Sequence, residues 1–220
     1  MTKQQVRVAV DNCIFAVRHG RLEVLLIQMK KKPFDHVWAL PGGLMEDGET
    51  LDGAASRILE QQTGVSDVYL EQLYTFDDQS RDPDGRVISV AYVSLIPWEA
   101  HDLRTTDKYR AVRFWDVDRV PAKLAYDHRE ILDTARNRLA AKIQYTNCVW
   151  SLLPERFTLS ELQNAYETVL HRSLDKRNFR KKILALDLVK PLGEKSSGGR
   201  HRPAMLYSFG SREPEHVEVF

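Results

Sequence analysis

The sequence has no apolar run long enough to cross a membrane, and it has very little cysteine. Its longest apolar runs are of the length of Val24 to Ile27, far below the roughly 20 residues that a membrane-spanning helix needs. The first residues, MTKQQVRV, lack the apolar core of a secretory signal peptide. The two cysteines, Cys13 and Cys148, lie in apolar runs without metal-site spacing. These absences predict buried thiols in a protein of the reducing cytoplasm, with no membrane partner.

Strong net charge is also missing, but the charge is unevenly distributed. The 220 residues include 43% hydrophobic and 29% charged residues, which is ordinary for a globular protein of one large or two small domains. The formal net charge is only +1. From His171 to Arg202, however, 10 Lys and Arg face 3 Asp and Glu, a local net charge of +7. This asymmetry predicts an anionic partner for the C-terminal part of the chain.

The stretch WALPGGLMEDGETLDGAASRILEQQTGV, from Trp38 to Val65, spaces glycines, a glutamate and an arginine at fixed intervals. It resembles a Nudix box. The positions of that frame are Gly43, Glu49, Arg57, Gly64 and Val65. The resemblance implies a Nudix fold, with Glu49 and Arg57 in a structural contact. The glycines would permit tight turns. The alternative is a chance match in a segment rich in Gly and Glu.

The helix of this motif lacks the expected carboxylates. Thr50 predicts the N-cap of a helix that runs to Gln62. Where the family places glutamate, the chain has Ile58, Gln61 and Gln62, spaced to share one helix face. Three carboxylates there would bind Mg²⁺, whereas these neutral side chains cannot offset its charge. We therefore expect no catalytic residue, no metal and no cofactor. The alternative is an active hydrolase that recruits acids from other loops.

A second resemblance covers Arg81 to Tyr92, RDPDGRVISVAY. It is similar to the segment that ADP-ribose-type Nudix proteins place over their substrate, which makes Arg81 and Arg86 candidates for a phosphate or base contact. A solvated, charged hairpin is the alternative. The predicted ligand-binding residues are Gly42, Gly43, Glu49, Arg57, Arg81 and Arg86.

Segments rich in β-branched and aromatic residues predict the strands of a mixed sheet. They are residues 6–17, 22–29, 68–76, 86–97 and 110–115. Apolar residues at helical spacing predict a helix at 126–143, with Asp127 as a possible cap. A sheet of these strands with the helices predicted at 50–62 and 126–143 predicts an α/β sandwich, which the Nudix resemblance makes an α/β/α sandwich. We assign residues 1–145 to this effector-sensing domain.

The remaining residues, 146–220, have the parts of a winged helix-turn-helix. Helices are predicted at 146–153, 158–170 and about 175–186, and strands at 188–192 and 205–209, around a polar tip at 193–203. Thr158 and Glu161 fit a capping box. The third helix would enter the DNA major groove, and the wing would contact the DNA backbone or the minor groove. The predicted DNA-binding residues are Lys176, Arg177, Asn178, Arg180, Lys181, Lys195, Arg200, His201 and Arg202. A solvated basic face is the alternative.

Together the two parts resemble the Nudix-related transcriptional regulators of NAD metabolism. The resemblance implies a repressor of NAD biosynthesis or salvage genes that binds a palindromic double-stranded DNA operator as a homodimer. Its effector would be ADP-ribose or a related nucleotide. Two alternatives stay open: a pyrophosphatase of ADP-ribose or nucleoside-diphosphate sugars whose basic tail attracts substrate, and an RNA-binding Nudix protein. The second is weakened because few aromatic residues lie among the basic ones.

Overall fold

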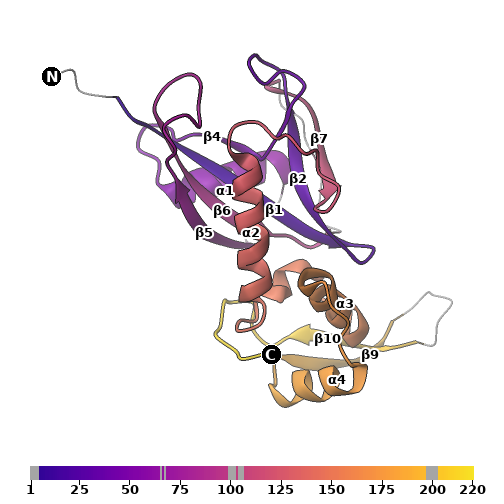
Figure 1. The fold of residues 1–220 in the computed structure, drawn as a ribbon. Coiled ribbons are helices and arrows are strands. Elements are labelled where there is room, and N and C mark those ends of the chain that lie inside the picture. The colour runs from indigo at the N-terminus through magenta and orange to yellow at the C-terminus, as the bar shows by residue number, and fades with distance from the viewer. Residues whose placement is uncertain (1–4, 65, 67, 99–102, 104–106, 197–202) are drawn as a thin grey trace.

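A mixed β-sheet with one helix on each face forms the first part of the molecule (Figure 1). The computed structural model describes residues 5–64, 66, 68–98, 103, 107–196 and 203–220. The strands are β1 (Arg7–Arg18), β2 (Arg21–Met29), β3 (Trp38–Ala39), β4 (Gly42–Leu44), β5 (Tyr69–Phe76), β6 (Val87–Leu95) and β7 (Tyr109–Asp116). The helices are α1 (Leu51–Thr63) and α2 (His128–Lys142).

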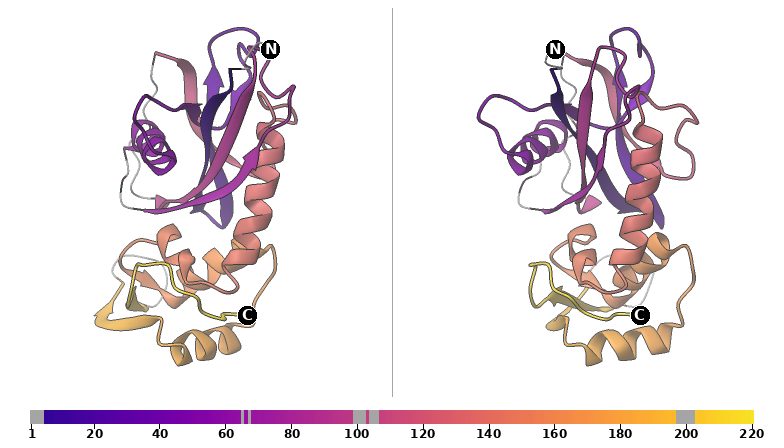
Figure 2. Two further views of the ribbon diagram at one scale, coloured as in Figure 1. Left: turned by 90° about the vertical axis from the view of Figure 1, so that its left-hand side faces the viewer. Right: turned by 60° about the vertical axis from the view of Figure 1, so that its left-hand side comes forward.

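Strand β1 is the centre of this sheet. The main order is β3-β2-β1-β6-β5, with β4 also paired to β1 and β7 to β2. Alternation along β1 sends Val10 toward α1, whereas Cys13 and Phe15 belong to the core that includes α2. The two helices therefore cover opposite faces of the sheet (Figure 2), which confirms the predicted α/β/α sandwich. Cys13 and Cys148 are buried, as expected.

The second part is a small helical unit with a three-stranded sheet. Its elements are the 3₁₀ helix η2 (Cys148–Leu152), β8 (Phe157–Thr158), α3 (Leu159–Leu170), α4 (Lys176–Ala185), β9 (Val189–Lys195) and β10 (Met205–Phe209). The strand order is β8-β10-β9. Tyr166 of α3 packs against Phe179 of α4, and Phe157 against Phe209 of the sheet. These are the helices and the wing of a winged helix-turn-helix, and α2 points down to them (Figure 1).

Residues 211–220, which we name the C-terminal strap, tie the end of α2 to this winged helix. Asn147 donates to the Glu213 carbonyl at 2.9 Å and accepts the Glu215 N–H at 2.8 Å. Further along, the Val219 N–H donates to the Gln144 carbonyl at 2.8 Å. Phe220 then places its ring beside Tyr166 of α3 and Phe179 of α4. One segment therefore contacts the exit of α2 and both helices.

Several local predictions need correction. The helix expected at 146–153 is the short 3₁₀ helix η2, and the two- and three-residue strands β3, β4 and β8 were not expected. Strand β9 continues to Lys195, inside the polar tip. The capping box of Thr158 and Glu161 is confirmed, with both of its hydrogen bonds present. In the part of the chain that the structure describes, no helix has the length and apolarity to cross a bilayer.

Candidate functional site

The loop before α1 is held by the contact that the Nudix frame predicts. Thr50 caps the helix by accepting the Gly53 N–H at 3.1 Å. Arg57 donates to both carboxylate oxygens of Glu49, at 2.7 and 2.9 Å. These bonds, together with the backbone N–H of Glu46, lower the pKa of Glu49 to about 2. The Glu49–Arg57 contact is confirmed, and it fixes the loop onto the helix.

The helix positions where the family places glutamate do not fit a divalent metal. Ile58 and Gln62 are each 3% exposed and face the protein interior. All three positions lie within α1, so the spacing that places them on one side of the helix is kept, but Gln61 is exposed to solvent. Among the described residues, the Oε1 atom of Gln62 has no hydrogen-bond partner. No group of three or more His, Cys, Asp or Glu side chains in the described ranges could hold a metal ion.

A cavity lies instead on the α2 side of the sheet, where β1, β4, the loop at 81–82 and the start of α2 meet. Its volume is about 120 Å³. It is lined by Ala9, Asp11, Ile27, Met29, Ala39, Leu40, Gly42, Gly43, Leu44, Arg81, Asp82, Val87, Tyr109, Tyr126 and His128. Of the predicted ligand residues, Gly42, Gly43 and Arg81 line it. Glu49 and Arg57 do not, and Arg86 instead donates to the Asp77 carbonyl at 2.6 Å.

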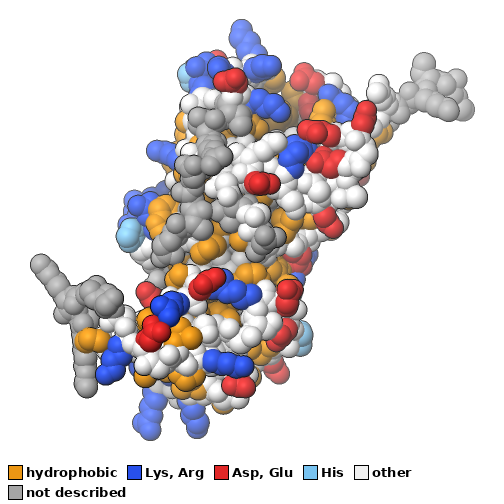
Figure 3. Space-filling view, turned by 180° about the vertical axis from the view of Figure 1, so that it is seen from behind, with side chains coloured by type: hydrophobic (Ala, Val, Ile, Leu, Met, Phe, Trp, Pro, Cys, Tyr) orange, Lys and Arg blue, Asp and Glu red, His pale blue; other side chains and the backbone are white. Residues whose placement is uncertain are grey.

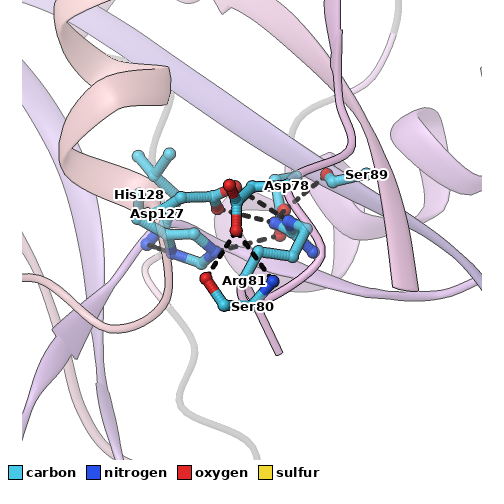
Figure 4. Close-up of polar contacts among 8 residues, drawn as sticks. Asp78, Ser80, Arg81, Ser89, Asp127 and His128 are labelled. Atoms are coloured by element: carbon cyan, nitrogen blue, oxygen red, sulfur yellow. Dashed lines mark hydrogen bonds and ion pairs between the residues drawn. The ribbon is translucent and has the colours of Figure 1, made fainter. Parts of the chain in front are cut away.

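Arg81 lines this cavity and bonds to two carboxylates, of which Asp127 is labelled in Figure 4. Its Nε and Nη2 atoms both donate to Asp127 at 2.8 Å, and Nη2 also donates to Asp11 Oδ2 at 3.1 Å. The side chain is only 3% exposed, so Arg81 is not part of a solvated hairpin. Asp127 precedes α2 as expected, but its side chain makes no capping bond and binds Arg81 instead.

Asp11 is the second carboxylate of this buried network. Its Oδ2 atom also accepts the Ser89 hydroxyl at 2.6 Å, and its Oδ1 atom lies 3.4 Å from His128 Nε2. His128 Nδ1 accepts the Leu40 N–H at 2.9 Å, so the ring turns its Nε2–H toward Asp11. Burial raises the pKa of Asp11, but attraction to His128, hydrogen bonds from His128 and Ser89, and Arg81 lower it to about 2. Asp11 is therefore ionised at neutral pH.

The walls beside this network are tightly fitted and aromatic. A Cβ atom on Gly42 would lie 2.0 Å from Asp11 Oδ1, so only glycine fits there. Tyr126 has a φ of 52°, in the left-handed region that side chains rarely adopt. Its ring lies 4.4 Å from that of Phe34 and 5.2 Å from that of His128. Strain of this kind is typical of functional sites.

Sequence reasoning missed Asp11, Asp127 and His128 as members of the site. One signal could have found Asp11: it is a charged residue inside the apolar run VAVDNCIFAV, where a buried carboxylate needs a partner. No local pattern marks Asp127 and His128, because they look like the polar start of a helix.

Five of the predicted DNA-binding residues lie on α4, and Lys195 lies on β9. Asp175 caps α4 by accepting the Asn178 N–H at 2.8 Å, and Phe179 and Ile183 are its buried face. Exposed on α4 are Lys176, Arg177, Asn178 and Lys181. In Figure 3, Lys and Arg side chains project from the lower end of the molecule, where α4 lies in Figure 1.

Arg180 differs from its neighbours on α4. It is half-buried, and its Nη2 atom donates to Ser160 of α3 at 3.1 Å. Lys195 is exposed at the end of β9. The predicted wing residues Arg200, His201 and Arg202 lie outside the described residues.

A Nudix sandwich with a cavity, joined through α2 to a winged helix with a basic helix face, defines a class: transcriptional regulators built on a Nudix domain. Comparison with known families agrees with this class. A Nudix domain matches residues 6–135, and the NrtR DNA-binding winged helix domain matches residues 149–209.

Individual relatives identify the family. The ADPR-responsive transcriptional repressor NtrR of Acinetobacter baylyi is 36% identical over 206 residues, which cover 93% of this chain and 82% of that protein. The structure of Shewanella oneidensis NrtR with a 27mer DNA is 34% identical, with a TM-score of 0.82 over 92% of this chain and 93% of that one. The chain belongs to the NrtR family of Nudix-related transcriptional regulators.

Two further similarities concern the Nudix domain alone. The Nudix domain of S. oneidensis NrtR, in complex with ADP-ribose, is 32% identical, with a TM-score of 0.56 over 63% of this chain and 90% of that one. An ADP-ribose pyrophosphatase of Methanocaldococcus jannaschii is 34% identical over 110 residues, which cover 50% of this chain and 63% of that enzyme.

Proposed function

We propose that this protein is a transcriptional repressor that releases its operator when ADP-ribose binds the cavity of the Nudix domain, without hydrolysing it. The regulated genes would be those of NAD biosynthesis or salvage, as the family resemblance implies. The observation that carries the proposal is the position of α2. Its N-terminal end holds the cavity network, and its C-terminal end leads into the winged helix.

Loss of hydrolysis follows from the chemistry of α1. A Nudix hydrolase needs carboxylates on this helix to hold Mg²⁺ against a pyrophosphate. Here the three positions carry Ile58, Gln61 and Gln62, of which the first is apolar and the others are uncharged. The competing function is a pyrophosphatase like the M. jannaschii relative. It would need a metal site built from other residues.

DNA binding in this proposal uses a homodimer on a palindromic operator in the cytoplasm. Two winged helices related by two-fold symmetry would read two half-sites, with α4 of each in a major groove. Half-sites one helical turn apart are about 34–36 Å from centre to centre. A small change in the spacing of the two winged helices would therefore break the match with the operator.

The direct test is a selection of genomic DNA fragments by the purified protein, with and without ADP-ribose. We expect a small set of palindromic fragments near genes of NAD metabolism, and their loss when ADP-ribose is added. Chromatography of the same mixtures, with Mg²⁺ or Mn²⁺ present, should show intact ADP-ribose. Turnover at ordinary enzyme rates, about 1 per second or more, would favour the pyrophosphatase instead.

A further inference from the structure

The cavity is too small to hold a whole dinucleotide-like ligand. At about 120 Å³ it is well below the roughly 300–1,000 Å³ of sites that enclose drug-sized ligands. ADP-ribose has a pyrophosphate between two chemically different ends, an adenosine and a second ribose. The cavity can therefore enclose one end, and the rest of the molecule must extend beyond its mouth.

The charges exclude the pyrophosphate from the cavity. Three carboxylates, those of Asp11, Asp82 and Asp127, lie in or against it. Arg81 is the one lysine or arginine among the described lining residues, and it is bonded to two of the carboxylates. Repulsion between like charges is strong at short range in a partly buried site. The predicted phosphate contact of Arg81 is therefore disfavoured, and an uncharged group fits better.

The walls distinguish the two uncharged ends. Most of the lining is apolar or aromatic, including Ile27, Met29, Val87, Tyr109 and Tyr126. A purine presents two apolar faces and a polar edge, which suits such walls. A ribose presents hydroxyl groups in several directions, and apolar walls would leave many of them without partners.

Asp82 carries a carboxylate oxygen that can accept a hydrogen bond from the edge of a base. It is half-buried in the lining, and its Oδ1 atom accepts the Asp84 N–H at 2.8 Å. Within the described part of the chain, its second carboxylate oxygen makes no hydrogen bond. An ionised carboxylate only accepts hydrogen bonds. It would therefore favour an amino group over a carbonyl at the edge of the base.

We propose, on the basis of the function proposed above, that the cavity takes the adenine base and that Asp82 reads its exocyclic amino group. The pyrophosphate and the second ribose then lie outside the cavity, near Gly43. A Cβ atom added to Gly43 would have no neighbouring atom within 4 Å, so there is open space beside this residue. Asp82 is thus a specificity-determining residue, and Arg81 is a positioning residue for Asp11 and Asp127.

The test compares ADP-ribose with its inosine analogue, IDP-ribose, by calorimetry on the full chain. The analogue has a carbonyl oxygen in place of the amino group, and that oxygen would face the Asp82 carboxylate. We expect ADP-ribose to bind at least about tenfold more tightly, as for the loss of one charge-assisted hydrogen bond. Equal affinities for the two ligands would overturn the assignment of the cavity.

Asp82→Asn sharpens the test. The asparagine carbonyl can still accept the Asp84 N–H, and its amide then turns a donor toward the base. The preference for ADP-ribose should fall to about one or reverse. Asp84→Asn is the matched control. It removes the same charge two residues further along the chain, from a side chain that does not line the cavity. It should keep the wild-type preference. An unchanged preference in Asp82→Asn would refute the role of Asp82.

Two fragments separate the possible occupants. Adenosine should compete with ADP-ribose, and ribose 5-phosphate should not. The opposite result would place the ribose in the cavity and overturn the proposal. Failure of the proposed function would give a different result. ADP-ribose would then leave operator binding unchanged, even if adenosine still bound more tightly than inosine. Binding of neither ligand would overturn both.

Discussion

The buried ion-pair network beside the cavity depends on Arg81, which bonds both of its carboxylates. Replacing it with alanine leaves Asp11 and Asp127 close together without their common counter-ion. Breaking a buried ion pair by removing one partner typically costs about 3–5 kcal/mol. We expect Arg81→Ala to lower the free energy of unfolding by that amount in urea titrations. Arg86→Ala is the control, because Arg86 makes one hydrogen bond to the Asp77 carbonyl and one 3.9 Å ion pair with the exposed Asp77 carboxylate, and its loss should cost about 1 kcal/mol. Equal losses in the two variants would contradict the network.

Asp11 predicts how stability depends on pH. Its pKa in the folded protein is lowered from 3.8 to about 2, so the unfolded chain binds the proton more readily. The stabilisation is complete above the unfolded pKa and is lost as pH falls through 4 toward 2. The shift corresponds to about 2 kcal/mol. Asp11→Asn should be less stable at pH 7 and should lose less further stability between pH 5 and 2. Parallel pH profiles of the two proteins would contradict this assignment.

Single residues were predicted well where their partners are close in sequence. Glu49 and Arg57 are 8 residues apart, and the motif that contains both indicates their contact. Arg81 is 70 residues from Asp11 and 46 from Asp127. These side chains come together only in the folded protein, so no pattern within one segment of the sequence predicts their contacts. The sequence therefore indicated that Arg81 matters, but not what it binds.

Among the elements, α4 has a prediction that separates two neighbouring arginines. Arg177 is exposed in the first turn, whereas Arg180 is half-buried and bonded to Ser160. If Arg177 contacts a base, Arg177→Ala should cost about 1–3 kcal/mol of operator binding and relax specificity at one position. Arg180→Ala should cost less, because its bond to Ser160 competes with a DNA contact. Fluorescence anisotropy with labelled operator can compare them. A larger loss for Arg180→Ala would mean that Arg180, and not Arg177, makes the main DNA contact, which would contradict this prediction.

Lysines on α4 should act through phosphates. Lys181 is exposed on the same helix, and Lys181→Ala should weaken binding to all sequences and reduce the salt slope by about 1. The same anisotropy titration, repeated at several salt concentrations, measures that slope. An unchanged slope would mean that Lys181 lies away from the DNA backbone.

The C-terminal strap has a stability prediction of its own. Phe220 packs beside both Tyr166 and Phe179, and Arg172 lies 5.4 Å from its ring. Removing a partly buried aromatic ring should cost about 2 kcal/mol, less than the 3–5 kcal/mol of a fully buried one. Phe220→Ala should lower the unfolding midpoint, whereas Glu218→Ala, at an exposed position, should stay within about 0.5 kcal/mol of wild type. Equal midpoints for Phe220→Ala and wild type would show that the strap adds no stability.

Long elements were predicted from the sequence and short ones were not. Helix α3 begins at its predicted capping box and ends at Leu170, and β1, at Arg7–Arg18, lies one residue from its predicted bounds of 6–17. Periodicity over eight or more residues, or a cap, gives a local signal for such elements. Strands β3, β4 and β8 have two or three residues, which is too few for any period. Their pairing with β2, β1 and β10 decides their conformation.

At the scale of the whole molecule, α2 is the physical link between the cavity and the winged helix. Its 15 residues span about 22 Å at 1.5 Å per residue. Asp127 and His128 attach its first turn to the cavity network, and Gln144 and Asn147, just beyond its last turn, bind the C-terminal strap. A ligand that shifts the network would therefore act on the element that positions the winged helix.

The central claim is that ADP-ribose and operator DNA bind with negative coupling through this link. By thermodynamic linkage, a ligand that weakens DNA binding must itself bind the DNA-bound protein more weakly by the same factor, typically about 5–150-fold. Calorimetric titration of ADP-ribose into the free protein and into its operator complex measures that factor directly. We predict a dissociation constant at least about fivefold higher for the complex. Equal dissociation constants for the two would contradict the coupling.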